Sequence, residues 1–115
     1  MKNTPQSFLP ISEPIIYILL SLSPGPKHGY AILKDMDDLS DRRTRLSVST
    51  LYESLGRLLS EGLIERVEET DGKSTLRPRK IYRLSPLGRE VLAAEIDRMQ
   101  GLVARAERRL GSEIS

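Results

Sequence analysis

Residues 47–62 read SVSTLYESLGRLLSEG, and this stretch decides the fold. Apolar residues recur in it three or four positions apart, as on one face of an α-helix; they are Val48, Leu51, Tyr52, Leu55, Leu58 and Leu59. Ser47 is a favourable cap for a helix start, and Gly62 is typical just past a helix end. The opposite face is mostly small and polar, with Ser49, Thr50, Glu53, Ser54, Gly56 and Arg57. Gly56 costs a helix interior up to about 1 kcal/mol relative to alanine, for which close approach to DNA or to another helix is one reason.

Two short strands and a basic connection follow this helix. The strand candidates are residues 63–69 and 79–84, and alternation in the second places Tyr82 and Leu84 on one side. The connection 70–78 contains an Asp-Gly turn signal but is too long for a tight hairpin, so we expect a projecting flap. No acidic residue occurs between Asp71 and Glu90. Such a basic run is either a solvated surface or a contact for a polyanion.

Two further helices are expected before residue 47. Ser12 is a candidate cap, with Glu13 and Pro14 in the first turn, and residues 15–22 are apolar almost all round, which favours burial on more than one side. Residues 23–26, SPGP, end this helix. A second helix is predicted from residue 27 or 28 to residue 39, with its apolar face at Tyr30, Ile32, Leu33 and Met36. Gly29 in its first turn would let another backbone approach closely.

The last helix is predicted to be long. Ser85 is its expected cap and Pro86 its first residue, and it runs to about residue 110. Its apolar residues step by four and three, at Leu92, Ile96, Met99, Val103, Ala106 and Leu110. This spacing fits either a coiled-coil seam or a helix packed along its own domain. Because about 25 helical residues span some 37 Å, more than so small a core covers, we expect part of this seam to contact a partner chain.

Composition excludes several classes of protein. The chain has 115 residues, 38% of them apolar and 30% charged, with a formal net charge of +2, which fits one soluble domain. It has no cysteine and one histidine, His28, so disulfides, thiol catalysis and Cys- or His-rich metal sites are excluded. It contains neither a span of about 20 apolar residues nor a signal-peptide pattern, so we expect a cytoplasmic protein. No nucleophile–base pair or glycine-rich phosphate loop occurs, and we expect no enzyme, no cofactor and no metal.

The order of elements predicts a mostly α fold with a small β-hairpin (α+β). It is a winged helix-turn-helix domain followed by a long C-terminal dimerisation helix. We divide the chain into an N-terminal extension (1–11), the winged helix-turn-helix DNA-binding domain (12–85), and the dimerisation helix with its tail (86–115). The third helix suits DNA, since its start offers free N–H groups and a positive dipole end to phosphate and a helix fits the major groove.

Several motifs, in this order, resemble the PadR-like transcriptional regulators. They are PKHGY (26–30), LSVSTLYESLGRL (46–58), EGLI (61–64) and RKIYRLSPLGR (79–89). The length resembles the short branch, which has a single C-terminal dimerisation helix. The resemblance implies a cytoplasmic homodimer that represses transcription from operator DNA, with 47–60 as recognition helix and 70–78 as wing. It also implies pairing through the first and last helices, and response to a small aromatic or drug-like effector. Val48, Glu53 and Gly56 depart from the family pattern.

The candidate site residues follow. Those expected to contact DNA are Ser47, Ser49, Thr50, Tyr52, Arg57, Lys73, Arg77, Arg79, Lys80, Tyr30, Arg43 and Arg45, with Arg42 beside them. Those expected at the dimer interface are Ile15, Ile16, Leu19, Leu92, Ile96, Met99, Val103, Ala106 and Leu110.

Three of these side chains, and also His28, have two possible interpretations. Tyr52 fits a buried ring with its hydroxyl at the rim as well as a DNA contact, and Tyr30 fits inward packing as well as a phosphate contact. Arg57 fits a salt bridge with Glu53 or Glu61, each four residues away. His28 fits a hydrogen bond across the helix junction or a pH switch.

The sequence therefore predicts a sequence-specific DNA-binding transcriptional regulator. We expect a repressor that binds a pseudo-palindromic operator as a homodimer, with double-stranded DNA, a second copy and an effector as partners. The alternative is a winged-helix protein-interaction module without specific DNA binding. The acidic residues Asp35, Asp37, Asp38 and Glu53 favour that alternative, because they weaken a purely polyanion-binding face.

Overall fold

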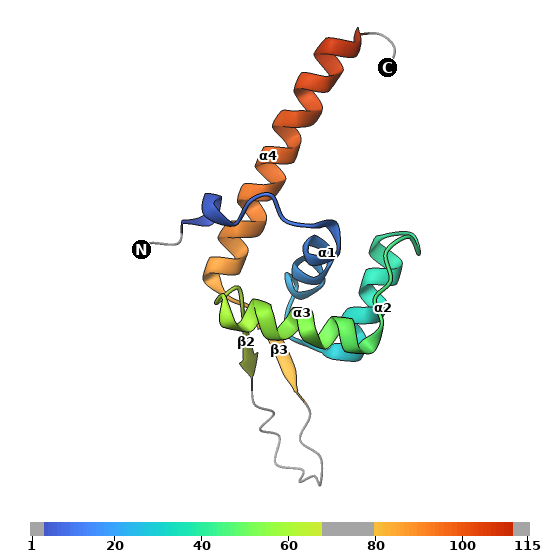
Figure 1. Cartoon of the computed structure of the whole chain (residues 1–115), viewed down its shortest axis with the longest axis vertical. Coiled ribbons are helices and arrows are strands. Elements are labelled where there is room, and N and C mark those ends of the chain that lie inside the picture. Colours follow the sequence, from blue (N-terminus) through green and yellow to red (C-terminus); the bar gives the residue numbers. More distant parts are fainter. Residues whose placement is uncertain (1–3, 68–79, 112–115) are drawn as a thin grey trace, which may run out of the picture.

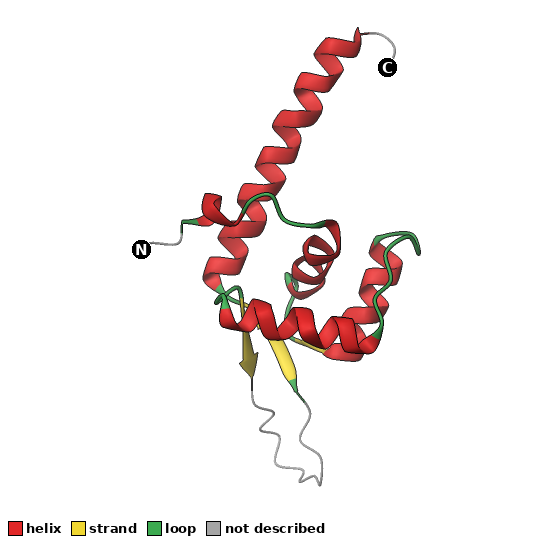
Figure 2. Ribbon diagram, viewed as in Figure 1, coloured by secondary structure: helices red, strands yellow, loops and turns green. Residues whose placement is uncertain are grey.

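The computed structural model describes residues 4–67 and 80–111. Figures 1 and 2 show helices around a small sheet, with one long helix leaving the domain. The elements are the 3₁₀ helix η1 (Pro5–Phe8), α1 (Glu13–Leu22), β1 (Lys27–His28), α2 (Gly29–Leu39), α3 (Val48–Ser60), β2 (Ile64–Val67), β3 (Ile81–Leu84) and α4 (Pro86–Leu110). The predicted mostly helical winged fold is confirmed. The flap predicted at 70–78 lies outside the described residues.

The sheet has three strands, one more than the sequence predicted. Its order is β1-β3-β2, with both pairs antiparallel, and Lys27 pairs with Tyr82 while Ile64 pairs with Leu84. Lys27 and His28 were expected to start α2, so that boundary was wrong. A strand of two residues has no periodicity to recognise, and it exists because β3 offers a free edge for pairing.

The core forms where the helices meet the sheet. α1 packs against α2, α4 and β3, which fulfils the prediction of burial on more than one side. The fully buried apolar side chains come from α1, α2, α3, β2 and α4, and include Ile18, Leu19, Leu22, Ile32, Met36, Leu51, Leu55, Ile64 and Val91. In β3, Tyr82 and Leu84 face this core, as alternation predicted.

The boundaries of α3 are set by the residues that the sequence indicated. The Ser47 hydroxyl accepts a hydrogen bond from the amide of Thr50 at 3.1 Å. At the other end Gly62 adopts a φ of +79°, and the amide of Leu63 donates to the carbonyl of Leu58 at 3.0 Å. This is the hydrogen bond of a helix that closes on a left-handed glycine. Ser12 precedes α1 as expected, but its side chain makes no cap hydrogen bond.

A junction of hydrogen bonds joins the end of α3 to the start of α4. The Ser85 hydroxyl donates to the carbonyl of Gly62 at 2.6 Å and accepts from the amide of Gly88 at 2.9 Å. The amide of Ser85 donates to the carbonyl of Leu63 at 3.1 Å. A Cβ at Gly88 would overlap that same carbonyl oxygen and lie 2.9 Å from its carbon. Backbone therefore meets backbone at this point, and only glycine fits.

Residues 4–11 cover the first part of α4. Phe8, Leu9 and Ile11 pack against the core, and the amide of Ile11 donates to Glu95 Oε2 at 3.1 Å. Glu95 is 0% exposed. Arg98 holds the same carboxylate with two hydrogen bonds, of 2.6 Å and 3.0 Å. The hydrogen bond from Arg98 is the main cause that lowers the pKa of Glu95, against the opposing effect of burial.

We predict that Gly88→Ala destabilises the domain, by about 1–3 kcal/mol, because the new methyl group meets a backbone oxygen that cannot rotate away. Urea unfolding followed by circular dichroism measures the loss. Gly101→Ala is the matched control, since a Cβ there meets only the end of the Arg105 side chain at 3.4 Å. Equal stability of the two variants would contradict the close backbone contact between Gly88 and the carbonyl of Leu63.

The Glu95 carboxylate should make stability depend on pH. A carboxyl whose pKa is lowered by folding stabilises the native state above its unfolded pKa of about 4.3. That contribution is lost as the pH falls through the folded pKa. Glu95→Gln should therefore be less stable than the wild type at pH 7, and the difference should shrink as the pH falls below about 4. A difference that stays constant from pH 7 to pH 3 would rule out this role for the charge.

Candidate nucleic-acid interface

The outward face of α3 is the surface from which the candidate site is built. In Figure 1 this helix runs across the domain from the foot of α4 to α2. Its inward side chains, Leu51, Leu55 and Leu58, are buried. Its outward residues are exposed and comprise Val48, Ser49, Thr50, Tyr52, Glu53, Gly56, Arg57 and Ser60. Val48 was expected on the apolar face, but it is 45% exposed because it stands in the first turn, beyond the core.

Three hydroxyls cluster at the start of α3. The Ser47 hydroxyl lies 2.9 Å from Thr50 Oγ1, to which it donates, and 3.3 Å from the hydroxyl of Ser49. The Ser47 side chain caps only the amide of Thr50. The first amides of a helix have no acceptor within the helix, so Val48 and Ser49 present N–H groups at the same end. This combination of hydroxyls, amides and a positive dipole end suits a phosphate or a base edge.

Tyr52 and Tyr30 lie at the junction of α2 and α3. A Cβ at Gly29 would overlap the Tyr52 hydroxyl and lie 2.8 Å from Cζ, so Gly29 makes room for a side chain and not for a backbone, contrary to expectation. Tyr52 remains 38% exposed, so its ring packs on α2 and still has a free edge. Tyr30 is 73% exposed. Its expected place on the apolar face of α2 was wrong, because it sits in the first turn, where the helix leaves the sheet.

The cations flanking α3 differ in how they are held. All three side chains, Arg43, Arg45 and Lys80, are exposed, and Arg45 is in addition tied to α2 by a 2.8 Å ion pair with Asp37. Within the described residues Arg57 forms no ion pair with Glu53 or Glu61, so the salt-bridge interpretation is wrong for this structure. Lys73, Arg77 and Arg79 lie outside the described residues.

The loop before α3 contains two residues with a positive φ. Asp41 and Arg42 both adopt left-handed conformations, with φ of +56° and +67°. The buried Ser40 hydroxyl accepts from the amide of Thr44 at 2.9 Å, so this amide has a hydrogen-bond partner within the loop.

His28 is the residue before α2, and its side chain makes no cap hydrogen bond there.

The residues expected at a dimer interface fall into two groups. Ile15 and Leu19 are 9% and 0% exposed and belong to the core of this chain, so they offer a partner almost no surface, while Ile16 is half-buried. On α4, Leu92 is buried, but the seam becomes exposed toward the C-terminus, with Ile96 at 37%, Val103 at 54% and Leu110 at 48%. Met99 is half-buried and Ala106 is exposed.

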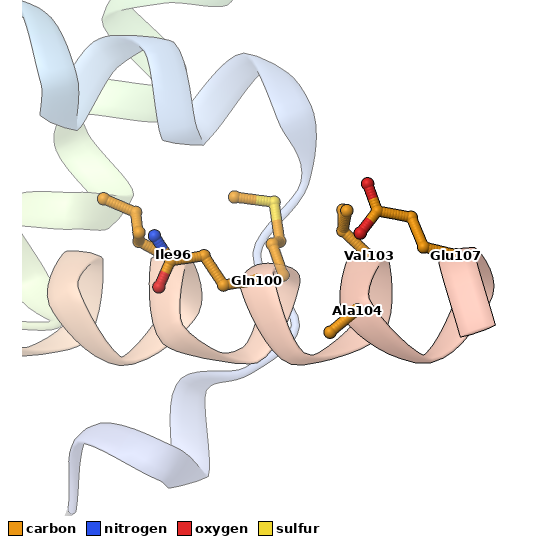
Figure 3. A pocket seen from close by; sticks show the side chains of 6 residues that line it. Ile96, Gln100, Val103, Ala104 and Glu107 are labelled. Atoms are coloured by element: carbon orange, nitrogen blue, oxygen red, sulfur yellow. The ribbon is translucent and has the colours of Figure 1, made fainter. Parts of the chain in front are cut away.

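A shallow, open concavity runs along this part of α4. Figure 3 shows its lining, which is mostly apolar and comprises Ile96, Met99, Gln100, Val103, Ala104 and Glu107. All six residues come from α4, so within residues 4–67 and 80–111 no second element lines this concavity.

Residues 4–67 and 80–111 contain no cluster of three or more His, Asp or Glu side chains able to hold a metal ion. No helix in the same ranges is both long enough and apolar enough to cross a membrane.

Comparison with known proteins found a matching family and similar solved structures. Residues 18–94 match the model of the transcriptional regulator PadR-like family. A PadR family transcription regulator from Clostridium difficile R20291 has a similar structure, with a TM-score of 0.70 and 25% identity, over 87% of this chain and 100% of that one. Bacillus subtilis PadR, solved in complex with operator DNA, has a TM-score of 0.61 and 25% identity, over 71% of this chain and 46% of that one.

A curated relative is longer than this chain. It is an uncharacterized 37.1 kDa protein in transposon TN4556 of Streptomyces fradiae, 38% identical over 88 residues. The match covers 76% of this chain and 23% of the relative, so this chain corresponds to about a quarter of that protein.

Proposed function

The chain belongs to the PadR-like family of transcriptional regulators, and from this membership we propose that it is a repressor that binds a pseudo-palindromic operator as a homodimer. The family and its solved members are transcription regulators and not enzymes, and one of these members was solved in complex with operator DNA.

The observation that carries the proposal is the free outward face of α3. An α-helix fits the major groove of B-form DNA, and this one exposes hydroxyls and amides at its start, where phosphate binds best. Arg43 is an exposed cation in the loop before α3, and Lys80 is an exposed cation just before β3; exposed cations beside the helix would neutralise backbone phosphates. The B. subtilis regulator, which shares this fold, was crystallised on operator DNA. By analogy, α3 would read the bases while the flanking residues hold the backbone.

Dimerisation would cover the exposed apolar seam of α4. Val103, Leu110 and the neighbouring Leu102 are each about half exposed, and apolar seams of this spacing pair with a second helix. A two-fold dimer would present two copies of α3 to successive turns of the major groove, about 34–36 Å apart. The concavity around Met99 and Val103 would then face the other subunit, where both chains could enclose a small aromatic or drug-like effector. A repressor of this kind acts in the cytoplasm, where its operator is.

We predict specific binding to the DNA upstream of the protein's own gene. Fluorescence anisotropy, compared with a scrambled duplex at two salt concentrations, should show tighter binding to the native duplex that persists at the higher salt. Binding to both duplexes equally, with loss at the higher salt, would favour the protein-interaction module instead.

The wing can be tested in the same assay. Reversing the charges of Arg77 and Arg79 to glutamate should weaken binding to every sequence and flatten the salt dependence, because fewer counterions are released. The matched control reverses Arg108 and Arg109 at the far end of α4, which changes the net charge equally. If both pairs of charge reversals had the same effect on affinity, the wing would make no contribution of its own to DNA binding.

We also predict that Val103→Glu breaks the dimer. The wild type should have twice the mass of one chain in light scattering after gel filtration, and the variant should have the mass of one, because the charge would be buried in the paired seam. Arg105→Glu is the control on the same turn of α4. A wild type that is monomeric at micromolar concentration would contradict the dimer.

A further inference from the structure

The outward face of α3 carries almost no net charge. Between Val48 and Ser60 the sequence has one cation, Arg57, and one anion, Glu53. The remaining exposed residues of this face are neutral, namely Val48, Ser49, Thr50, Tyr52, Gly56 and Ser60. A helix that binds DNA by general attraction to phosphate would carry several cations on this face. The nearly neutral outward face of α3 is instead suited to hydrogen bonds with particular groups of the DNA bases.

Glu53 stands out because phosphates repel it. Its side chain is exposed, and among the described residues no ion pair or hydrogen bond neutralises it. Arg57 lies four residues later, where a helix allows such a pair, yet the two side chains remain apart. A carboxylate on a DNA-binding helix is tolerated where it points at a hydrogen-bond donor and away from the backbone phosphates.

Gly56 follows one turn after Glu53, on the same side of the helix. It lies in the middle of α3 without a positive φ, and a Cβ added there meets nothing within 4 Å. Neither backbone conformation nor packing within the described residues therefore requires glycine, although glycine destabilises the helix relative to alanine. A bare stretch of backbone serves the close approach of another molecule.

Base-edge chemistry selects the partner for this carboxylate. In the major groove of DNA, cytosine presents its N4 amino group as a donor, and a glutamate side chain can accept from it. Adenine also presents an amino donor, N6, but the N7 acceptor beside it repels a carboxylate, so cytosine is the better partner. Guanine presents only acceptors at this edge, so it would repel a carboxylate. Reaching the groove floor requires the helix to lie close to the DNA, and the missing Cβ at Gly56 removes the obstacle beside Glu53.

We propose that Glu53 is a specificity-determining residue that accepts a hydrogen bond from the N4 amino group of a cytosine in each operator half-site, with Gly56 allowing α3 to seat closely enough for this contact. This inference rests on the proposed function. Arg57, the one arginine of α3, can only donate hydrogen bonds, so it cannot recognise the amino donor that cytosine presents.

The first experiment selects bound duplexes from a randomised pool with the wild type, Glu53→Gln, Glu53→Ala and Glu90→Gln. Glu90 is an exposed carboxylate on α4, so Glu90→Gln removes the same charge elsewhere. The wild type should require cytosine at one position of each half-site, by about fivefold or more over other bases. Glu53→Ala should lose this preference, and Glu53→Gln should lose it or change it to adenine, which glutamine can bind. Glu90→Gln should select the wild-type site.

The second experiment separates binding from stability. Gly56→Ala should unfold at the same temperature as the wild type or up to about 5 °C higher, yet bind the selected duplex at least about fivefold more weakly. Gly101→Ala, also in a helix interior but on α4, should gain stability without losing affinity. An unaltered affinity of Gly56→Ala would overturn the close seating of α3.

The outcomes distinguish this inference from the proposed function. A wild type that selects no sequence would overturn both. A wild type that selects an operator, with Glu53→Ala selecting the same bases with the same cytosine preference, would overturn the role of Glu53 and leave the proposed function intact.

Discussion

The rest of the structure depends on the contact between the Ser85 turn and the end of α3. Through one hydroxyl, Ser85 both caps α4 and holds the carbonyl of Gly62, while Gly88 lets α4 touch the backbone at Leu63. These bonds fix the angle between the helix proposed to read DNA and the helix proposed to pair two subunits. In a dimer, that angle sets the distance between the two copies of α3. A change in the packing of α4 would therefore move both copies of α3, since the start of α4 contacts the backbone that directly follows α3.

Three glycines show how the same residue serves three different constraints. Gly88 lies against a backbone carbonyl, Gly29 against the end of the Tyr52 side chain, and Gly56 against no atom within 4 Å of an added Cβ. A backbone neighbour cannot yield, whereas a tyrosine ring can rotate outward at a smaller cost. Gly88 is therefore required for folding, whereas Gly29 makes room for the Tyr52 side chain at the candidate interface. The third has no role within the described fold, which is why we relate it to DNA.

The sequence predicted those features that local patterns determine. Periodicity located α1, α3 and α4, and Ser47, Gly62 and Ser85 marked ends that the structure confirms. Features that depend on tertiary pairing were missed: β1 has two residues, and the buried Glu95 looked like any polar position of an amphipathic helix. Residue type also misled, because Val48 and Tyr30 are apolar or aromatic yet stand in first turns, outside the core. Resemblance indicated Ile15 and Leu19 as dimer contacts, although the core of the single chain already buries them.

The proposed function assigns affinity and specificity to different parts of this molecule. Sequence-independent attraction to DNA comes from neutralised phosphates, and the cations able to supply it lie in the loop before α3 and in the basic run between Asp71 and Glu90. α3 itself, with one cation and one anion, contributes little to that attraction. A nearly neutral reading helix gains little from non-operator DNA, so most of its binding energy is available only when the base edges match. Such a division raises the ratio of specific to non-specific affinity, which is the quantity that decides whether a regulator finds its operator among many competing sites.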